Sequence, residues 1–88
     1  KGAQIDMLIE HTQSKSIDIV ECKYYNGLFT IDKKYKEELQ HKIAMFNKQT
    51  KNKYNIRLIL ITANGVNKNE HYNEIVSQHI ELTELFEA

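Results

Sequence analysis

Three polar residues on two strand-like segments, 3–10 and 16–25, have the types and spacing of a metal-dependent hydrolytic site. Asp6 lies on the first segment, and Glu21 and Lys23 lie on the second. Side chains alternate between the faces of a strand, so Glu21 and Lys23 point to the same face. Carboxylates are typical ligands of Mg²⁺ and Mn²⁺, and lysine adds positive charge where a phosphodiester transition state builds negative charge. We therefore predict metal ligation by Asp6 and Glu21, with Lys23 orienting or deprotonating the attacking water.

The polar stretch 11–15 between the two segments predicts a turn and therefore an antiparallel hairpin. With the turn centred on this stretch, Asp6 lies opposite Glu21 and Gln4 lies opposite Lys23. Residues directly opposite share a face, with Cβ atoms roughly 5 Å apart, so the four side chains would form one polar cluster in which Gln4 is an accessory candidate. A slip of one residue would scatter the cluster. The open alternative is that these charges form ordinary surface salt bridges.

The same register gathers apolar side chains on the other face of the hairpin, namely those of Ile5, Met7, Ile9, Val20 and Cys22. Cys22 is the only cysteine, which excludes an internal disulfide and favours a cytoplasmic setting. We expect it to be a buried core residue. Asp18 points to this face too, and we expect it at the exposed end of its strand.

A single apolar stripe predicts an amphipathic helix that ends near Gln49. The stripe recurs every three or four residues and consists of Ile31, Tyr35, Leu39, Ile43 and Phe46. Thr30 is the predicted N-cap, with Asp32 in the first turn. This helix separates the hairpin from the next apolar segment.

The segment 55–62 is almost continuously apolar, which is typical of a strand buried on both faces in parallel pairing. A right-handed strand–helix–strand crossover would place it parallel to the second strand of the hairpin. The stretch 64–69 reads as a loop, and 74–82 fits either a final strand or a short helix. Thr83 is a candidate N-cap for a short terminal helix, 84–87. The whole chain, 1–88, is then one α/β domain with a mixed sheet.

This order of motifs resembles the PD-(D/E)xK nuclease superfamily, and most closely the C-terminal nuclease-like domain of prokaryotic AAA-type ATPases. The resemblance extends over segments 2–9, 17–23, 29–35, 58–62 and 82–86. It implies a restriction-endonuclease-like core, truncated at its N-terminal helix, with Asp6, Glu21 and Lys23 at the active-site positions. It also favours a strand over a helix for 74–82. It also implies Mg²⁺- or Mn²⁺-dependent DNA phosphodiester hydrolysis and a preceding ATPase domain in a longer protein. The alternative function is that of a catalytically inactive accessory module of that ATPase.

Charge is balanced over the chain but is segregated along it. Of the twelve basic residues, seven lie within 33–53, where only two acidic residues oppose them, whereas 70–88 holds five glutamates and no basic residue. Lys33, Lys34 and Lys36 are therefore candidate contacts for a DNA backbone, although lysines also commonly line the solvated face of a helix. The acidic tail suits contact with the expected ATPase domain.

Other functional classes lack a signal in the sequence. No apolar run approaches the roughly 18 residues of a membrane span, so we expect no membrane insertion. The three glycines are too far apart to form a phosphate-binding loop, so no nucleotide site is expected within this chain. An unpaired sheet edge would favour self-association into an oligomer.

Overall fold

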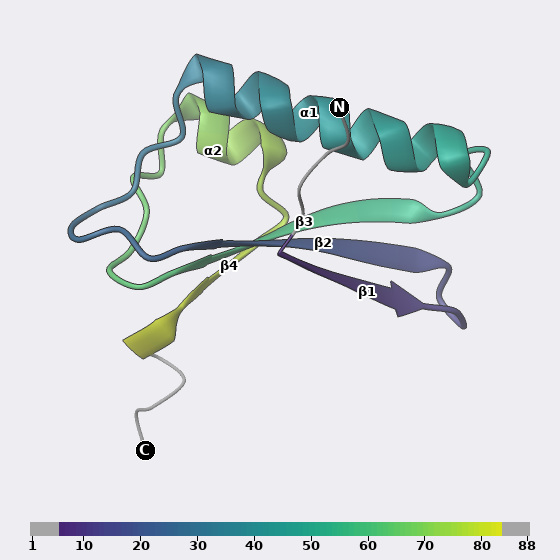
Figure 1. Ribbon diagram of the computed structural model, residues 1–88, viewed down its shortest axis with the longest axis horizontal. Coiled ribbons are helices and arrows are strands. Elements are labelled where there is room, and N and C mark those ends of the chain that lie inside the picture. The colour runs from purple at the N-terminus through teal and green to yellow at the C-terminus, as the bar shows by residue number, and fades with distance from the viewer. Residues whose placement is uncertain (1–5, 84–88) are drawn as a thin grey trace.

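The computed structural model describes residues 6–83, which form a four-stranded mixed sheet with two helices on one face (Figure 1). In chain order the elements are β1 (Met7–His11), β2 (Ser16–Lys23), α1 (Lys33–Gln49), β3 (Asn55–Thr62), α2 (Glu70–Ile75) and β4 (Gln78–Glu81). The strands lie in the order β1-β2-β3-β4. β1 is antiparallel to β2, and the other pairs are parallel. The predicted α/β class, hairpin and β2–α1–β3 unit are confirmed.

The register of the hairpin is the one that the sequence predicts. Met7 pairs with Val20, and the ladder runs without a break to His11 opposite Ser16. Carried one residue beyond Met7, the same register would set Asp6 opposite Glu21, but Asp6 lies in a bend that precedes β1 and is outside the ladder. Gln4, the predicted partner of Lys23, lies outside the described residues.

The helices cover the face of the sheet that bears Glu21. Ile19 of β2 and Leu58 of β3 are fully buried on this face against Leu39 of α1 and Ile75 of α2. A second buried cluster, at the end of the sheet nearer the start of α1, consists of Ile31, Leu60 and Val66. The core therefore lies on the side to which the predicted polar cluster points.

The prediction that Cys22 belongs to the core is wrong, because its side chain is on the opposite face and is only half-buried. On that face Met7 and Ile9 are 51% and 40% exposed. The reason lies in β2 and β3, where Ile19 and Leu58 offer a more continuous apolar surface for the helices than the hairpin does. β1 is an edge strand, exposed along its whole length.

Helix α1 ends at Gln49 as predicted, but its start differs from the prediction. Asp32 rather than Thr30 is the N-cap, because its Oδ1 accepts a hydrogen bond from the backbone N–H of Tyr35 at 2.8 Å. Ile31 therefore precedes the helix, although it is fully buried. The carboxylate thus fixes the position at which α1 begins, one turn before Tyr35.

The predicted strand over 74–82 is wrong in its first half. Asn69 caps α2, since its Oδ1 accepts a hydrogen bond from the N–H of Tyr72 at 2.9 Å, and the chain enters β4 only at Gln78. The predicted terminal helix 84–87 lies outside the described residues, but the prediction that Thr83 precedes it as the N-cap is wrong, because Leu82 and Thr83 are already helical. Neither α1 nor α2, the helices of the described part of the chain, has the length and hydropathy needed to cross a membrane.

Candidate functional site

Glu21 is the centre of the candidate site and is almost completely buried between β2 and α1. Its residue exposure is 4%, and both of its carboxylate oxygens have a partner on the helix. The Tyr35 hydroxyl donates a hydrogen bond to Oε1 at 3.3 Å, and the Lys42 ammonium donates to Oε2 at 3.1 Å. The Lys42 side chain is itself only 14% exposed. A buried carboxylate is tolerated when it is paired and hydrogen-bonded in this way.

Lys23 is held beside the same tyrosine through the face of the aromatic ring. Its Nζ lies 4.6 Å from the ring centroid of Tyr35 and 5.7 Å from that of Phe29. The two rings pack edge to face, with centroids 5.7 Å apart. An ammonium near the negative face of a ring is stabilised by a cation–π interaction. Lys23 is therefore positioned over Tyr35, whose hydroxyl donates to Glu21.

Asp6 directly precedes β1 and contacts the backbone of β2. Its Oδ2 accepts a hydrogen bond from the N–H of Cys22 at 2.7 Å, and its side chain is otherwise exposed. Burial raises the pKa of Tyr35 well above its ordinary value near 10, and the negative charges of Glu21 and then of Asp6 raise it further. Both carboxylates thus act on the same hydroxyl. The structure brings Asp6, Glu21 and Lys23 to one end of the sheet.

The raised pKa of Tyr35 predicts a loss of stability at alkaline pH. The folded state holds the phenol proton of Tyr35 more tightly than the unfolded state does. The contribution of this proton to the free energy of unfolding is therefore fully present below pH ~10 and is lost as the pH rises above that value. Because only one proton is released, the free energy of unfolding can fall by at most about 1.4 kcal/mol per pH unit. Solvent screening at the partly exposed Tyr35 ring makes the decrease smaller. Urea unfolding between pH 9 and 11 should show a steeper loss for the wild type than for Tyr35→Phe. Equal slopes would contradict the prediction.

The roles of Tyr35 and Lys42 were not predicted from the sequence, although it contains a signal for each. Tyr35 was assigned to the apolar stripe only. Lys42 lies three positions after Leu39 and four before Phe46, so it also points inward on α1. A lysine at an inward helical position requires a buried acidic partner, and Glu21 is the inward carboxylate on the adjacent strand.

The three candidate DNA-backbone lysines lie at the start of α1 but differ in their surroundings. Lys33 and Lys34 are exposed. Lys36 is largely buried at its side chain, which is 15% exposed, and its Nζ pairs with Glu74 of α2 at 3.2 Å. Any contact with a phosphate backbone would therefore come more readily from Lys33 and Lys34 than from Lys36.

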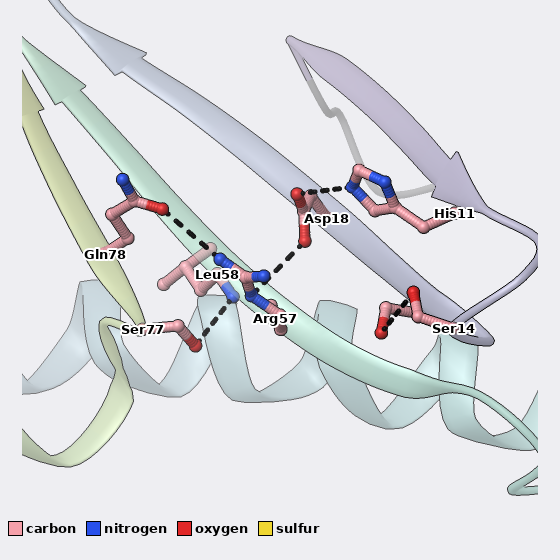
Figure 2. Close-up of polar contacts among 8 residues, drawn as sticks. His11, Ser14, Asp18, Arg57, Leu58, Ser77 and Gln78 are labelled. Carbon is pink, nitrogen blue, oxygen red and sulfur yellow. Dashed lines mark hydrogen bonds and ion pairs between the residues drawn. The ribbon is translucent and has the colours of Figure 1, made fainter.

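Asp18 occupies the opposite face of the sheet and is buried, so the prediction that it lies at an exposed strand end is wrong. Figure 2 shows its carboxylate between His11 of β1 and Arg57 of β3. Its Oδ2 lies 2.9 Å from His11 Nε2, and its Oδ1 lies 3.4 Å from Arg57 Nε. Arg57 also donates to Gln78 of β4 at 3.2 Å. This network links all four strands and is separate from the candidate site.

The oxygen donors of the candidate site are of the type that hard divalent cations bind, but one of them already has a counter-ion. Asp6 and Glu21 offer carboxylates, and Mg²⁺ commonly binds one or two carboxylates and completes its shell with waters. Within residues 6–83, no group of three or more histidine, cysteine or acidic side chains is arranged to hold a metal. The ammonium of Lys42 already neutralises Glu21. A cation would therefore use a two-carboxylate set and compete with Lys42.

Comparisons of the chain with models of known protein families, with curated proteins and with solved structures gave no significant match.

Proposed function

We propose that this chain is a restriction-endonuclease-like domain of the PD-(D/E)xK type, with a Mg²⁺- or Mn²⁺-dependent site for hydrolysis of DNA phosphodiesters. In this proposal Asp6 and Glu21 bind the metal, and Lys23 positions the attacking water. The domain belongs to an AAA-type ATPase and works in the cytoplasm, as the sequence resemblance and the single cysteine suggest.

The observation that carries the proposal is the β1–β2 register. Continued one residue past the β1 ladder, it would set Asp6 opposite Glu21, and the hydrogen bond from the Cys22 N–H to Asp6 Oδ2 at 2.7 Å supports this arrangement by holding Asp6 beside β2. The β2–α1–β3 unit adds support, because parallel pairing of β2 with β3 fixes the strand that bears Glu21 and Lys23 beneath α1. Exposed Lys33 and Lys34 at the start of α1 offer positive charge for a phosphate backbone.

Each residue has a chemical task that its surroundings support. A bound divalent cation would polarise a phosphoryl oxygen and lower the pKa of its water. Asp6 and Glu21 would hold the cation through carboxylate oxygens. Lys23, held over the Tyr35 ring at 4.6 Å, would direct its positive charge to the developing negative charge of the phosphate.

The second candidate function is that of a non-catalytic accessory module of the same ATPase. The ion pair between Lys42 and Glu21 favours this alternative, since a carboxylate with a built-in counter-ion stabilises charge within the fold without a metal. In that case the basic and acidic segments would serve contacts with the ATPase domain or weak contacts with DNA.

A calorimetric titration with Mn²⁺ separates the two functions. We expect saturable binding by the wild type and at least tenfold weaker binding by Asp6→Asn, because mutation even of an outer-shell partner of a metal ligand typically costs about 10- to 100-fold in affinity. Thermal melts must show that both proteins are folded, and Asn replaces Asp at nearly constant volume. Absence of binding by both folded proteins would contradict the metal-dependent function and favour the accessory module. Binding by the wild type alone would justify assays of DNA cleavage.

A further inference from the structure

We propose that Lys42 is the internal counter-ion of Glu21, and that a divalent cation reaches this carboxylate by displacing the Lys42 ammonium. The inference rests on the metal site proposed above but concerns a residue outside the predicted Asp6, Glu21 and Lys23 set. It assigns to α1 a direct part in setting the affinity for metal.

Both carboxylate oxygens of Glu21 already have a donor, so a divalent cation would meet the Lys42 ammonium at this carboxylate. Lys42 Nζ lies 3.1 Å from Oε2, and the Tyr35 hydroxyl lies 3.3 Å from Oε1. A Mg²⁺ ion binds a carboxylate oxygen at about 2.0–2.1 Å. Metal and ammonium on one buried carboxylate would repel each other strongly, because the surrounding protein screens charge much less than water does. The two cations therefore exclude each other.

Lys42 is the partner that can move. Glu21 lies on β2, which is paired with β1 on one side and with β3 on the other, so its backbone is fixed. Lys42 lies on α1 and has a flexible four-carbon stem that can carry the ammonium to water while its methylenes stay packed. Its side chain already has 14% exposure. Tyr35 can keep its hydrogen bond to Oε1 throughout this exchange.

The matched pair of variants that tests this displacement is Lys42→Met and Lys36→Met. Both remove one positive charge from α1 at side chains of nearly equal exposure, 14% and 15%, but only Lys42 contacts Glu21, because Lys36 pairs with Glu74. Calorimetric titration with Mn²⁺ should show at least about tenfold tighter binding by Lys42→Met than by the wild type, whereas Lys36→Met should bind as the wild type does. If both variants bound Mn²⁺ more tightly to the same extent, the gain in affinity would come from the lower net charge alone. That result would overturn the inference.

The possible outcomes separate this inference from the proposed function. Metal binding by the wild type with no gain in folded Lys42→Met would overturn the displacement and leave the metal site standing. Metal binding by Lys42→Met alone would overturn displacement, because it would mean that the cation cannot replace the Lys42 ammonium on Glu21 in the wild type. Absence of binding by the wild type and by folded Lys42→Met would overturn the metal site, and the inference with it.

If Lys42→Met does not fold, the displacement of Lys42 can be tested by a measurement on the wild type. In a Mg²⁺ titration followed by NMR, the side-chain ε-CH₂ signals of Lys42 should shift towards those of a solvated lysine as the site fills. The signals of Lys36 should stay in place. Unchanged Lys42 signals in a protein whose Asp6 signals report saturation would overturn the displacement, whereas unchanged Asp6 and Lys42 signals would overturn the metal site.

Discussion

Replacement of Leu39 by Ala is expected to lower the free energy of unfolding by about 3 kcal/mol. Leu39 is fully buried at the centre of the contact between α1 and the sheet, where it packs with Ile19, Leu58 and Ile75. The substitution removes apolar contacts from both layers and leaves a cavity that the surrounding strands cannot easily close. This loss is a large share of the roughly 5–15 kcal/mol that stabilises a typical domain. Thermal melting should therefore show a decrease of more than roughly 10 °C.

The matched control for this substitution is Leu28→Ala. Leu28 is 62% exposed in the connection between β2 and α1, so the same change of side chain should alter stability by no more than about 0.5 kcal/mol. Comparable losses for the two variants, measured by urea unfolding, would contradict the assignment of Leu39 to the centre of the core.

The sequence predicted the hairpin well because two independent patterns agree there. The polar stretch 11–15 limits where the turn can lie, and the alternation of apolar side chains around Met7 and Val20 disfavours a slip. β3 was equally clear, since its bounds, Asn55–Thr62, follow an almost continuous apolar run. Such runs fit a central strand, and β3 pairs with strands on both sides.

The short elements were harder to predict because local propensity says little about a helix of one or two turns. α2 has six residues, too few to show helical periodicity, and its start depends on the hydrogen bond between the Asn69 side chain and the N–H of Tyr72. The strand predicted over 74–82 therefore wrongly included the last two residues of this helix. Likewise Asp32 and Thr30 are both acceptable caps by type, and only the hydrogen bond to Tyr35 decides between them.

Which face of the hairpin carries the core could not be read from the hairpin itself. The face with Met7 and Val20 is the more apolar one within β1 and β2, but the position of α1 depends on β3 as well. Parallel pairing aligns Ile19 with Leu58, and these two residues form the surface that Leu39 covers. Glu21 follows on the same face, which explains how a charged residue becomes buried and why it needs Lys42.

The ion pair between Glu21 and Lys42 can be broken by replacing either residue, and we expect the loss of stability to be larger when Lys42 is replaced. Lys42→Met leaves a carboxylate on a fixed central strand without its ammonium, and we expect a loss of about 3 kcal/mol in the free energy of unfolding. Glu21→Leu should cost less, about 1 kcal/mol, because the released Lys42 can extend its ammonium into water. Urea unfolding at pH 7 and constant ionic strength measures both values.

The double variant, Glu21→Leu with Lys42→Met, decides why the pair is present. Replacement of a buried ion pair by apolar side chains of similar volume is often neutral or stabilising, so we expect the double variant to be more stable than Lys42→Met by about 2 kcal/mol or more. If the double variant recovers the stability of the wild type, the fold does not need this ion pair. That result would favour a role for Glu21 in the proposed metal site. If the double variant were instead as unstable as the sum of the single variants, the coupling energy between Glu21 and Lys42 would be zero, and the ion pair itself would contribute nothing to the stability of the β2–α1 contact.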